Sequence, residues 1–205
     1  MRLGEEADQI MIAGVDMLHL DVMDHHYVPN LTFGPQMCEA LKKRNPNWEI
    51  DVHLMVQPVD QLIHSFALAG ATRINIHPES TLHLDRSLQL IHNLGCKVGL
   101  VLNPSTTQDC LAFCAHRLDS IMIMTVNPGF GGQELIPQMF EKISIIHNLY
   151  PHIPISVDGG IRLENMPTLA RAGATQFVAG SAIFNQQNYA QTIEKMRQVL
   201  SVVEA

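Results

Sequence analysis

Residues 172–180 read AGATQFVAG, a glycine turn followed by a short apolar run, and the same order occurs three more times. Ala69-Gly70-Ala71-Thr72 stands before RINIH, Ala13-Gly14-Val15-Asp16 before MLHLDV, and a looser copy, Leu94-Gly95-Cys96-Lys97, before VGLVLN. Glycine just past a helix adopts the left-handed conformation without a Cβ clash, so the chain can enter a strand within two residues. Each copy therefore predicts a helix, a glycine turn and a strand.

Outward from these turns, seven short apolar runs alternate with helical patterns along the chain. The runs are apolar nearly throughout, which is typical of parallel strands that are covered on both faces. Successive runs begin about 22 to 33 residues apart, the length of a strand-helix unit with short connections. The strands are expected at 17–22, 50–55, 73–77, 97–102, 120–125, 153–158 and 175–180, and the helices at 3–13, 35–44, 59–69, 84–94, 107–116, 137–149, 164–172 and 187–203.

The polar residues favour a closed (βα)8 barrel over an open doubly wound sheet. In a barrel the carboxyl ends of all strands surround one pocket, whereas an open sheet brings together only the ends beside its switch point. The polar residues at the expected strand ends are His19, Asp21, His53, Asn103, Asn127, Asp158, Gly180 and Ser181. Because the sequence starts with a helix, the expected fold is an α/β TIM barrel without its first strand. A single (βα)8-barrel domain over 1–205, truncated before the first helix, is predicted.

The composition limits the classes of partner. The 205 residues, 46% of them hydrophobic, suffice for one large domain with a packed core. No apolar run approaches the roughly 20 residues of a membrane span, and the N-terminus lacks a signal peptide's apolar stretch. A net charge of −7 without a run of Lys and Arg argues against nucleic-acid binding. We expect a cytoplasmic protein that acts on a small molecule, with no nucleic-acid and no membrane partner.

The run MLHLDVMD places polar residues inside an apolar strand. In an extended strand His19, Asp21 and Met23 point to one face, and the residues between them point to the other. Burying a histidine and a carboxylate is costly unless a metal ion or a partner compensates. His53 in DVHLM and Asp158 after IPISV repeat this placement. Two histidines and two aspartates at strand ends predict a mononuclear site for Zn²⁺ or another divalent transition ion such as Fe²⁺ or Mn²⁺.

Glycine-rich loops follow the last three expected strands. Loops of this kind expose backbone N–H groups, and a helix that begins after them adds a partial positive charge, so they can bind phosphate. For any single loop a tight turn is an equally good interpretation, but three loops on the last three strands resemble the phosphate site typical of (βα)8 barrels. The loops contain Gly129, Phe130, Gly131, Gly132, Gly159, Gly160, Gly180 and Ser181.

Three methionines, Met23, Met55 and Met124, lie at inward strand positions near the proposed carboxylates. Methionine at such a position commonly fills the core. A second interpretation is that the three side chains line the reaction pocket with polarizable, non-acidic groups that exclude water.

Taken together, these stretches resemble the ribulose-phosphate 3-epimerase family. LDVMDHHYVPNLTFGP, DVHLMV, MTVNPGFGGQ, VDGGI and VAGSAIF stand in the family's order and spacing over essentially the whole chain. The resemblance implies a TIM barrel of the ribulose-phosphate-binding type and an isomerase of carbohydrate metabolism, in the pentose phosphate pathway. Its expected reaction interconverts D-ribulose 5-phosphate and D-xylulose 5-phosphate by inverting C3.

The resemblance also implies the site residues. It makes His19, Asp21, His53 and Asp158 the ligands of one divalent metal ion, Zn, Fe, Mn or Co, with Asp21 and Asp158 as the two acid/base groups. The glycine loops with Ser181 would hold the phosphate, His53 would also bind the substrate, and the three methionines would surround the reacting carbons. A homo-oligomer is a further expectation.

The chain departs from the family pattern at two places. Where the family commonly has Gly after the VMD triplet, this chain has His25, and we expect a local change of the loop only, since histidine tolerates unusual backbone angles better than most residues. The family also begins with a first strand whose serine contacts substrate, and this sequence starts just beyond it.

Two alternatives follow from these expectations. One is a related 3-epimerase of a six-carbon ketose phosphate, because the motifs fix the reacting centre better than the far wall of the pocket. The other is a non-catalytic truncated barrel, in which two strand edges beside the missing position would tend to pair with another chain.

Overall fold

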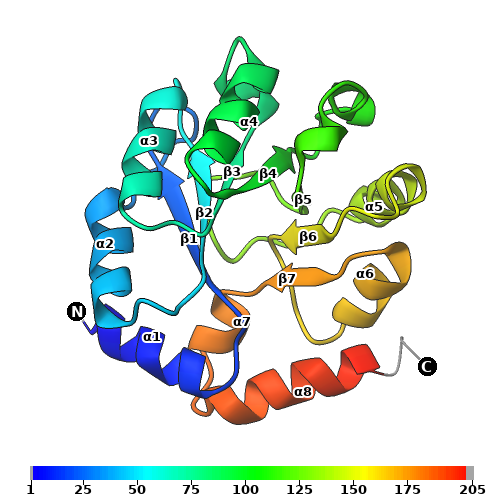
Figure 1. Cartoon of the computed structure of the whole chain (residues 1–205). Helices are drawn as coiled ribbons and strands as arrows, with labels where there is room; N and C mark the ends of the chain where they lie inside the picture. Colours follow the sequence, from blue (N-terminus) through cyan, green and yellow to red (C-terminus); the bar gives the residue numbers. More distant parts are fainter. Residues whose placement is uncertain (1, 202–205) are drawn as a thin grey trace.

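Seven parallel strands form the centre of the molecule in the computed structural model, which describes residues 2–201. Each strand pairs with the next one along the chain, so the order is β1-β2-β3-β4-β5-β6-β7, and the sheet curls into an open barrel (Figure 1). The strands are β1 (Leu18–Met23), β2 (Ile50–Met55), β3 (Arg73–Ile76), β4 (Lys97–Leu102), β5 (Ser120–Met124), β6 (Ile155–Asp158) and β7 (Gln176–Val178). Within the described residues β1 and β7 are the two unpaired edges, as the predicted fold requires.

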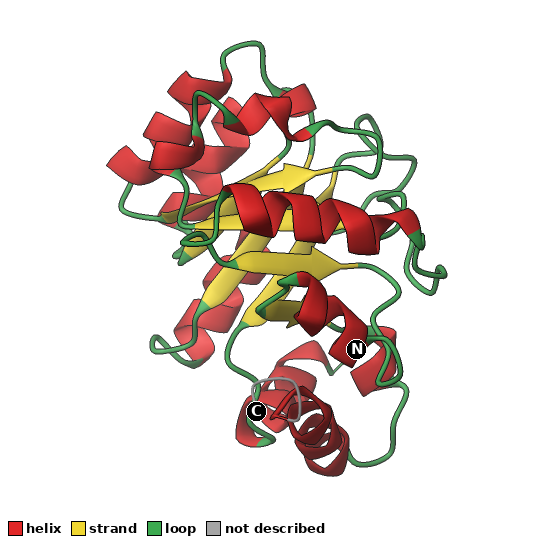
Figure 2. Cartoon of the chain, turned by 90° about the vertical axis from the view of Figure 1, so that its right-hand side faces the viewer, coloured by secondary structure: helices red, strands yellow, loops and turns green. Residues whose placement is uncertain are grey.

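Helices surround the curled sheet on its outer side (Figure 2). They are α1 (Leu3–Ile12), α2 (Pro35–Arg44), α3 (Asp60–Leu68), α4 (Leu84–Asn93), α5 (Gln138–Leu149), α6 (Met166–Ala172), α7 (Ser181–Phe184) and α8 (Tyr189–Ser201). The first and last long helices, α1 and α8, lie side by side across the seam between β1 and β7 (Figure 1). Tyr189 Oη donates a hydrogen bond of 2.5 Å to Glu6, and Arg197 donates one of 2.6 Å to the Gly14 carbonyl, so α8 is joined to the α1 region.

The predicted turns are confirmed. Gly14, Gly70, Gly95 and Gly173 each follow a helix and have φ between 80° and 112°, a conformation that excludes most other residues. Each helix can therefore reverse into the following strand within a few residues.

The side chains of the strands separate into an apolar outer set and an inner set that mixes polar residues with methionines and valines. Leu18, Leu20 and Val22 of β1 belong to the large core between sheet and helices, whereas His19 and Asp21 face the barrel interior. Strands that are covered on both faces are normally apolar on both faces. The polar residues in the interior of this barrel therefore indicate a use other than packing.

The prediction of a helix at 107–116 is wrong. The segment forms two short 3₁₀ helices, η2 (Gln108–Leu111) and η3 (Ala115–Arg117). Its buried side chains, Leu111 and Cys114, are three residues apart, which suits the 3₁₀ repeat of three, while Phe113 between them is 90% exposed.

The structure also adds the short η1 (Pro78–Ser80) and α7, and it ends β7 at Val178, before the expected residue 180. The last predicted residues of the final helix, 202 and 203, lie outside the described residues. No helix among residues 2–201 has the length and hydropathy needed to cross a membrane.

Candidate active site

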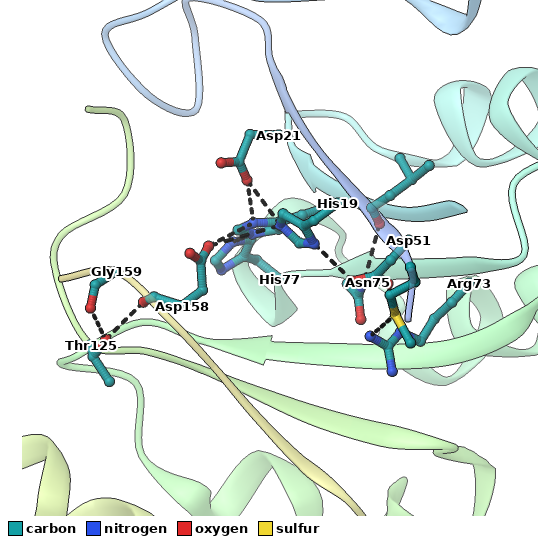
Figure 3. A network of polar contacts seen from close by, with 12 residues as sticks. His19, Asp21, Asp51, Arg73, Asn75, His77, Thr125, Asp158 and Gly159 are labelled. Atoms are coloured by element: carbon teal, nitrogen blue, oxygen red, sulfur yellow. Dashed lines mark hydrogen bonds and ion pairs between the residues drawn. The ribbon is translucent and has the colours of Figure 1, made fainter. Parts of the chain in front are cut away.

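Four side chains from three strands meet inside the barrel near the carboxyl ends of the strands (Figure 3). His19 and Asp21 come from β1, His53 from β2 and Asp158 from the end of β6. One ligand atom from each residue can be chosen so that all four atoms lie within 4.8 Å of one another. Asp21 and His53 are also direct neighbours in the register of β1 and β2, so the two-residue periodicity of the strands builds the cluster.

One nitrogen of each histidine faces both carboxylates. His19 Nε2 lies 3.2 Å from Asp21 Oδ1 and 4.0 Å from Asp158 Oδ2. His53 Nδ1 lies 3.0 Å and 3.7 Å from the same two oxygens. The two rings therefore direct different nitrogens, Nε2 and Nδ1, toward one small space.

The second nitrogen of each ring has a buried partner that is not among the predicted site residues. His19 Nδ1 donates to Asp51 over 2.7 Å, and His53 Nε2 lies 2.8 Å from His77 Nε2. Asp51 is in turn held by Arg73 and by Asn75. A signal was available in the sequence: RINIH alternates polar and apolar residues, as LHLDV does.

The cluster has strongly perturbed protonation equilibria. Burial alone would lower the pKa of His19, but hydrogen bonds to Asp21 and Asp51 raise that pKa well above its usual range. The pKa of His53 is also raised, since its hydrogen bonds to Asp158 and Asp21 outweigh burial. In turn the two histidines hold the pKa of the Asp21 carboxyl far below its ordinary value, although burial opposes this. Both shifts favour the protonated form of the histidine rings.

The donor set fits a divalent transition metal. Imidazole nitrogens and carboxylate oxygens are ligands that Zn²⁺, Fe²⁺ and Mn²⁺ accept. The hydrogen bond from His19 Nδ1 to a carboxylate is the outer partner commonly found behind a metal-binding histidine. The exposed fractions are 39% for the Asp21 side chain and 12% for that of Asp158, so both remain open to a ligand from the cavity. The cluster could therefore hold a metal ion.

A cavity of about 670 Å³ brings the other predicted site residues together. Its wall includes His19, Asp21 and Asp158, and His53 lies behind them, fully buried. The cavity continues past the cluster to the edges of β1 and β7 and to apolar side chains of α1 and α8, such as Ile10. The remaining predicted residues on the wall are Met23, Met55, Met124, Gly129, Phe130, Gly131, Gly132, Gly159, Gly160, Gly180 and Ser181.

Glycine is required in the loop after β6. Gly160 has φ 65°, and a Cβ at this position would lie 2.7 Å from the backbone nitrogen of Leu135. At Gly131 and Gly180, by contrast, a Cβ would meet open space. The helix after Gly180, α7, is only four residues long, so a strong helix dipole is not available there. Exposed backbone N–H groups are what these loops can offer a phosphate.

The three methionines are all buried, with at most 8% of each residue exposed. Met23 and Met55 are register partners and pack with Val28, whereas Met124 packs with Met122 and Val126 on the opposite side. They fill space between the strands, and all three also line the cavity.

The departure at His25 is accommodated locally, as predicted. Its φ is 59°, the left-handed region in which histidine is one of the better tolerated residues. The His25 amide donates to the Asn30 carbonyl, and Asp24 accepts the amides of His26 and Tyr27, so the loop is closed by its own hydrogen bonds.

Comparison with known proteins gives the family. The model of the "Ribulose-phosphate 3 epimerase family" matches residues 1–184. The chain belongs to this family. Ribulose-phosphate 3-epimerase of Escherichia coli strain K12 is 48% identical, over 98% of this chain and 92% of the relative. The enzyme of the same name from Buchnera aphidicola subsp. Acyrthosiphon pisum is 49% identical, over 97% of this chain and 89% of that one.

Solved structures at lower identity show the same fold. A structure of KGPDC from Streptococcus mutans matches with a TM-score of 0.78 at 14% identity, over 98% of this chain and 92% of that chain. 3-Hexulose-6-phosphate synthase from Salmonella typhimurium matches with a TM-score of 0.72 at 18% identity, covering 98% and 94%. The family membership makes this chain an isomerase of the epimerase type, built on an α/β barrel.

Proposed function

We propose that this chain is a metal-dependent epimerase that inverts C3 of D-ribulose 5-phosphate to give D-xylulose 5-phosphate. The observation that carries the proposal is the pair of carboxylates, Asp21 and Asp158, held with two histidines beside a cavity whose wall also contains three glycine loops. A sugar phosphate needs both parts: acid/base groups at the reacting carbon and a site for its phosphate at a distance.

The metal ligands in this proposal are His19, Asp21, His53 and Asp158. When bound, a divalent ion, Zn, Fe, Mn or Co, would act as a Lewis acid that stabilises negative charge on the sugar oxygens after deprotonation. The fit of the donor set supports this assignment.

Inversion at C3 needs two proton carriers. One carboxylate accepts the proton as the C3–H bond breaks, and the electron pair moves toward the neighbouring carbonyl oxygen. The other carboxylate, already protonated, donates its proton to the opposite face of C3 as the new C–H bond forms. Asp21 and Asp158 project from β1 and β6, on the two sides of the seam, which suits groups that act on opposite faces. In the reverse reaction their roles exchange.

The remaining cavity residues position the substrate. The loops with Gly129, Gly131, Gly132, Gly159, Gly160, Gly180 and Ser181 would bind the phosphate through their backbone N–H groups, and Met23, Met55 and Met124 would exclude water from the reacting carbons. An apolar wall strengthens electrostatic interactions at the carboxylates, because it lowers the local dielectric.

A coupled assay for D-xylulose 5-phosphate with Mn²⁺-loaded protein tests the proposal. Asp21→Asn and Asp158→Asn should each lower kcat by about 10² to 10⁴, the usual contribution of a general acid or base. Asp109→Asn, at an exposed residue of η2, is the control and should leave kcat unchanged. Wild-type turnover in both site variants would contradict the mechanism. A higher kcat/KM for a six-carbon ketose phosphate would reassign the substrate, and an inactive loaded protein would favour a non-catalytic barrel.

A further inference from the structure

A second polar cluster lies in the barrel interior, directly beneath the four proposed metal ligands. At its centre is Asp51 of β2, which is 2% exposed. One oxygen of Asp51 accepts a hydrogen bond of 2.7 Å from His19 Nδ1. The other accepts bonds of 2.5 Å from Arg73 Nε and 2.6 Å from Asn75 Nδ2 (Figure 3). The register places His19 beside Asp51 and Asp51 beside Arg73, so the three side chains form one row across three strands.

Packing does not explain this row. A buried ion pair contributes little net stability compared with apolar side chains of the same volume, because removing the two charges from water is costly. The Arg73 guanidinium has two further, partly buried contacts, 2.7 Å to Gln176 Oε1 of β7 and 3.4 Å to Met17 Sδ, so its orientation is fixed from several sides. A carboxylate that is held by three donors from three different residues has little freedom to rotate.

The fixed carboxylate determines the state of the His19 ring. An ionised carboxylate only accepts hydrogen bonds, so the Nδ1 that faces Asp51 must carry a proton. In the neutral ring the lone pair is then on Nε2, the nitrogen that faces Asp21 and Asp158. We propose that Asp51, oriented by Arg73 and Asn75, is a positioning residue that fixes the tautomer and the ring angle of His19 for metal binding through Nε2. This inference rests on the metal dependence of the proposed function.

The direct test is the ring state of His19 in ¹⁵N-labelled protein loaded with Zn²⁺. Two-bond ¹H–¹⁵N correlation spectra distinguish a protonated ring nitrogen from a metal-bound one, without any assay of activity. We expect a protonated Nδ1 and a metal-bound Nε2. The opposite assignment in the wild type would overturn the inference even if every variant failed to fold.

Variants measure the size of the effect. In Asp51→Asn one of the two carboxylate oxygens becomes an NH₂ group, which is itself a donor. In one orientation of the amide this NH₂ faces the donors of Arg73 and Asn75, and in the other it faces the His19 Nδ1–H. Two donors therefore meet in either orientation. Zn²⁺ affinity, measured by competition with a chelating dye, should fall about 10 to 100-fold, and kcat should fall more than KM changes. Arg73→Lys, which keeps the charge but not the planar fork, should lose less.

Asp85→Asn is the matched control, since it breaks an Asp–Arg pair with Arg117 on the surface, and it should leave Zn²⁺ affinity unchanged. Folded Asp51→Asn protein with Zn²⁺ affinity within twofold of the wild type and an unchanged His19 spectrum would show that Asp51 is only structural. That result would leave the proposed epimerase reaction intact. Absence of Zn²⁺ binding by the wild type would instead overturn the metal dependence and this inference together.

Discussion

At the scale of single residues, some glycines of the site cannot be replaced without strain, whereas others can. Gly160 is the clearest case, because its backbone is left-handed and its missing Cβ leaves room for the backbone of Leu135. Gly160→Ala should reduce the free energy of unfolding by about 1 to 3 kcal/mol and raise KM for a phosphorylated substrate. Urea unfolding and steady-state kinetics measure the two effects. Gly131→Ala, in open space, is the control and should unfold like the wild type; equal stability of both variants would contradict the steric argument.

The two histidines of the proposed metal site predict opposite pH dependences for the stability of the metal-free protein and for its metal affinity. Because the folded pKa of His19 lies well above its unfolded value, protonated His19 stabilises the metal-free fold fully below about pH 6.5, and this contribution is lost as the pH rises through the raised pKa. A metal ion must displace the proton from Nε2, so metal affinity should rise over the same pH window. Urea unfolding with a chelator and Mn²⁺ titrations at about pH 6 and about pH 8 would check both directions. An affinity for Mn²⁺ that does not change with pH would refute the assignment of the ring protons.

At the scale of elements, the strands and their glycine turns could be predicted because both rest on local chemistry. The register of β1 with β2, read as alternating polar and apolar positions, was enough to bring His19, Asp21 and His53 together, and Asp158 followed from its strand end. The supporting residues Asp51, Arg73 and His77 are not part of the predicted site. The alternation in RINIH shows that polar side chains face the interior, but their partners are more than 20 residues away in the sequence and become visible only in the fold. The segment after β4 was misjudged because a few apolar residues three apart suit a 3₁₀ helix and an α-helix almost equally.

The two 3₁₀ helices η2 and η3 predict that substitutions at neighbouring residues of this segment differ strongly in their effect on stability. Leu111 is fully buried, so Leu111→Ala should lower the free energy of unfolding by about 2 to 5 kcal/mol. Phe113, only two residues further on, points outward, and Phe113→Ser should change stability by about 0.5 kcal/mol or less. Chemical denaturation of both variants is the measurement. A large loss at Phe113 would mean that a continuous α-helix buries the other face.

At the scale of the whole molecule, the four proposed metal ligands span the open seam of the barrel. His19 and Asp21 lie on β1, Asp158 lies on β6, and only β7 separates β6 from the seam. A bound metal ion should therefore join the two sides of the seam and slow local opening of β1, β6 and β7. Hydrogen exchange followed by mass spectrometry, with Mn²⁺ and with a chelator, should show protection in these strands and little change in β3 and β4. Uniform protection of all strands would mean that the ion stabilises the fold only globally.

The cavity that reaches from Asp21 and Asp158 to the edges of β1 and β7 also bears on the fate of the transferred hydrogen. A proton that rests on a carboxylate between removal and return is in contact with any water that fills this space. In deuterium oxide, the isotope should therefore enter at C3 of the unreacted ketose as well as of its epimer. The ratio of deuterium in recovered substrate to deuterium in product would report how readily water in this cavity exchanges with the proton held by the carboxylate.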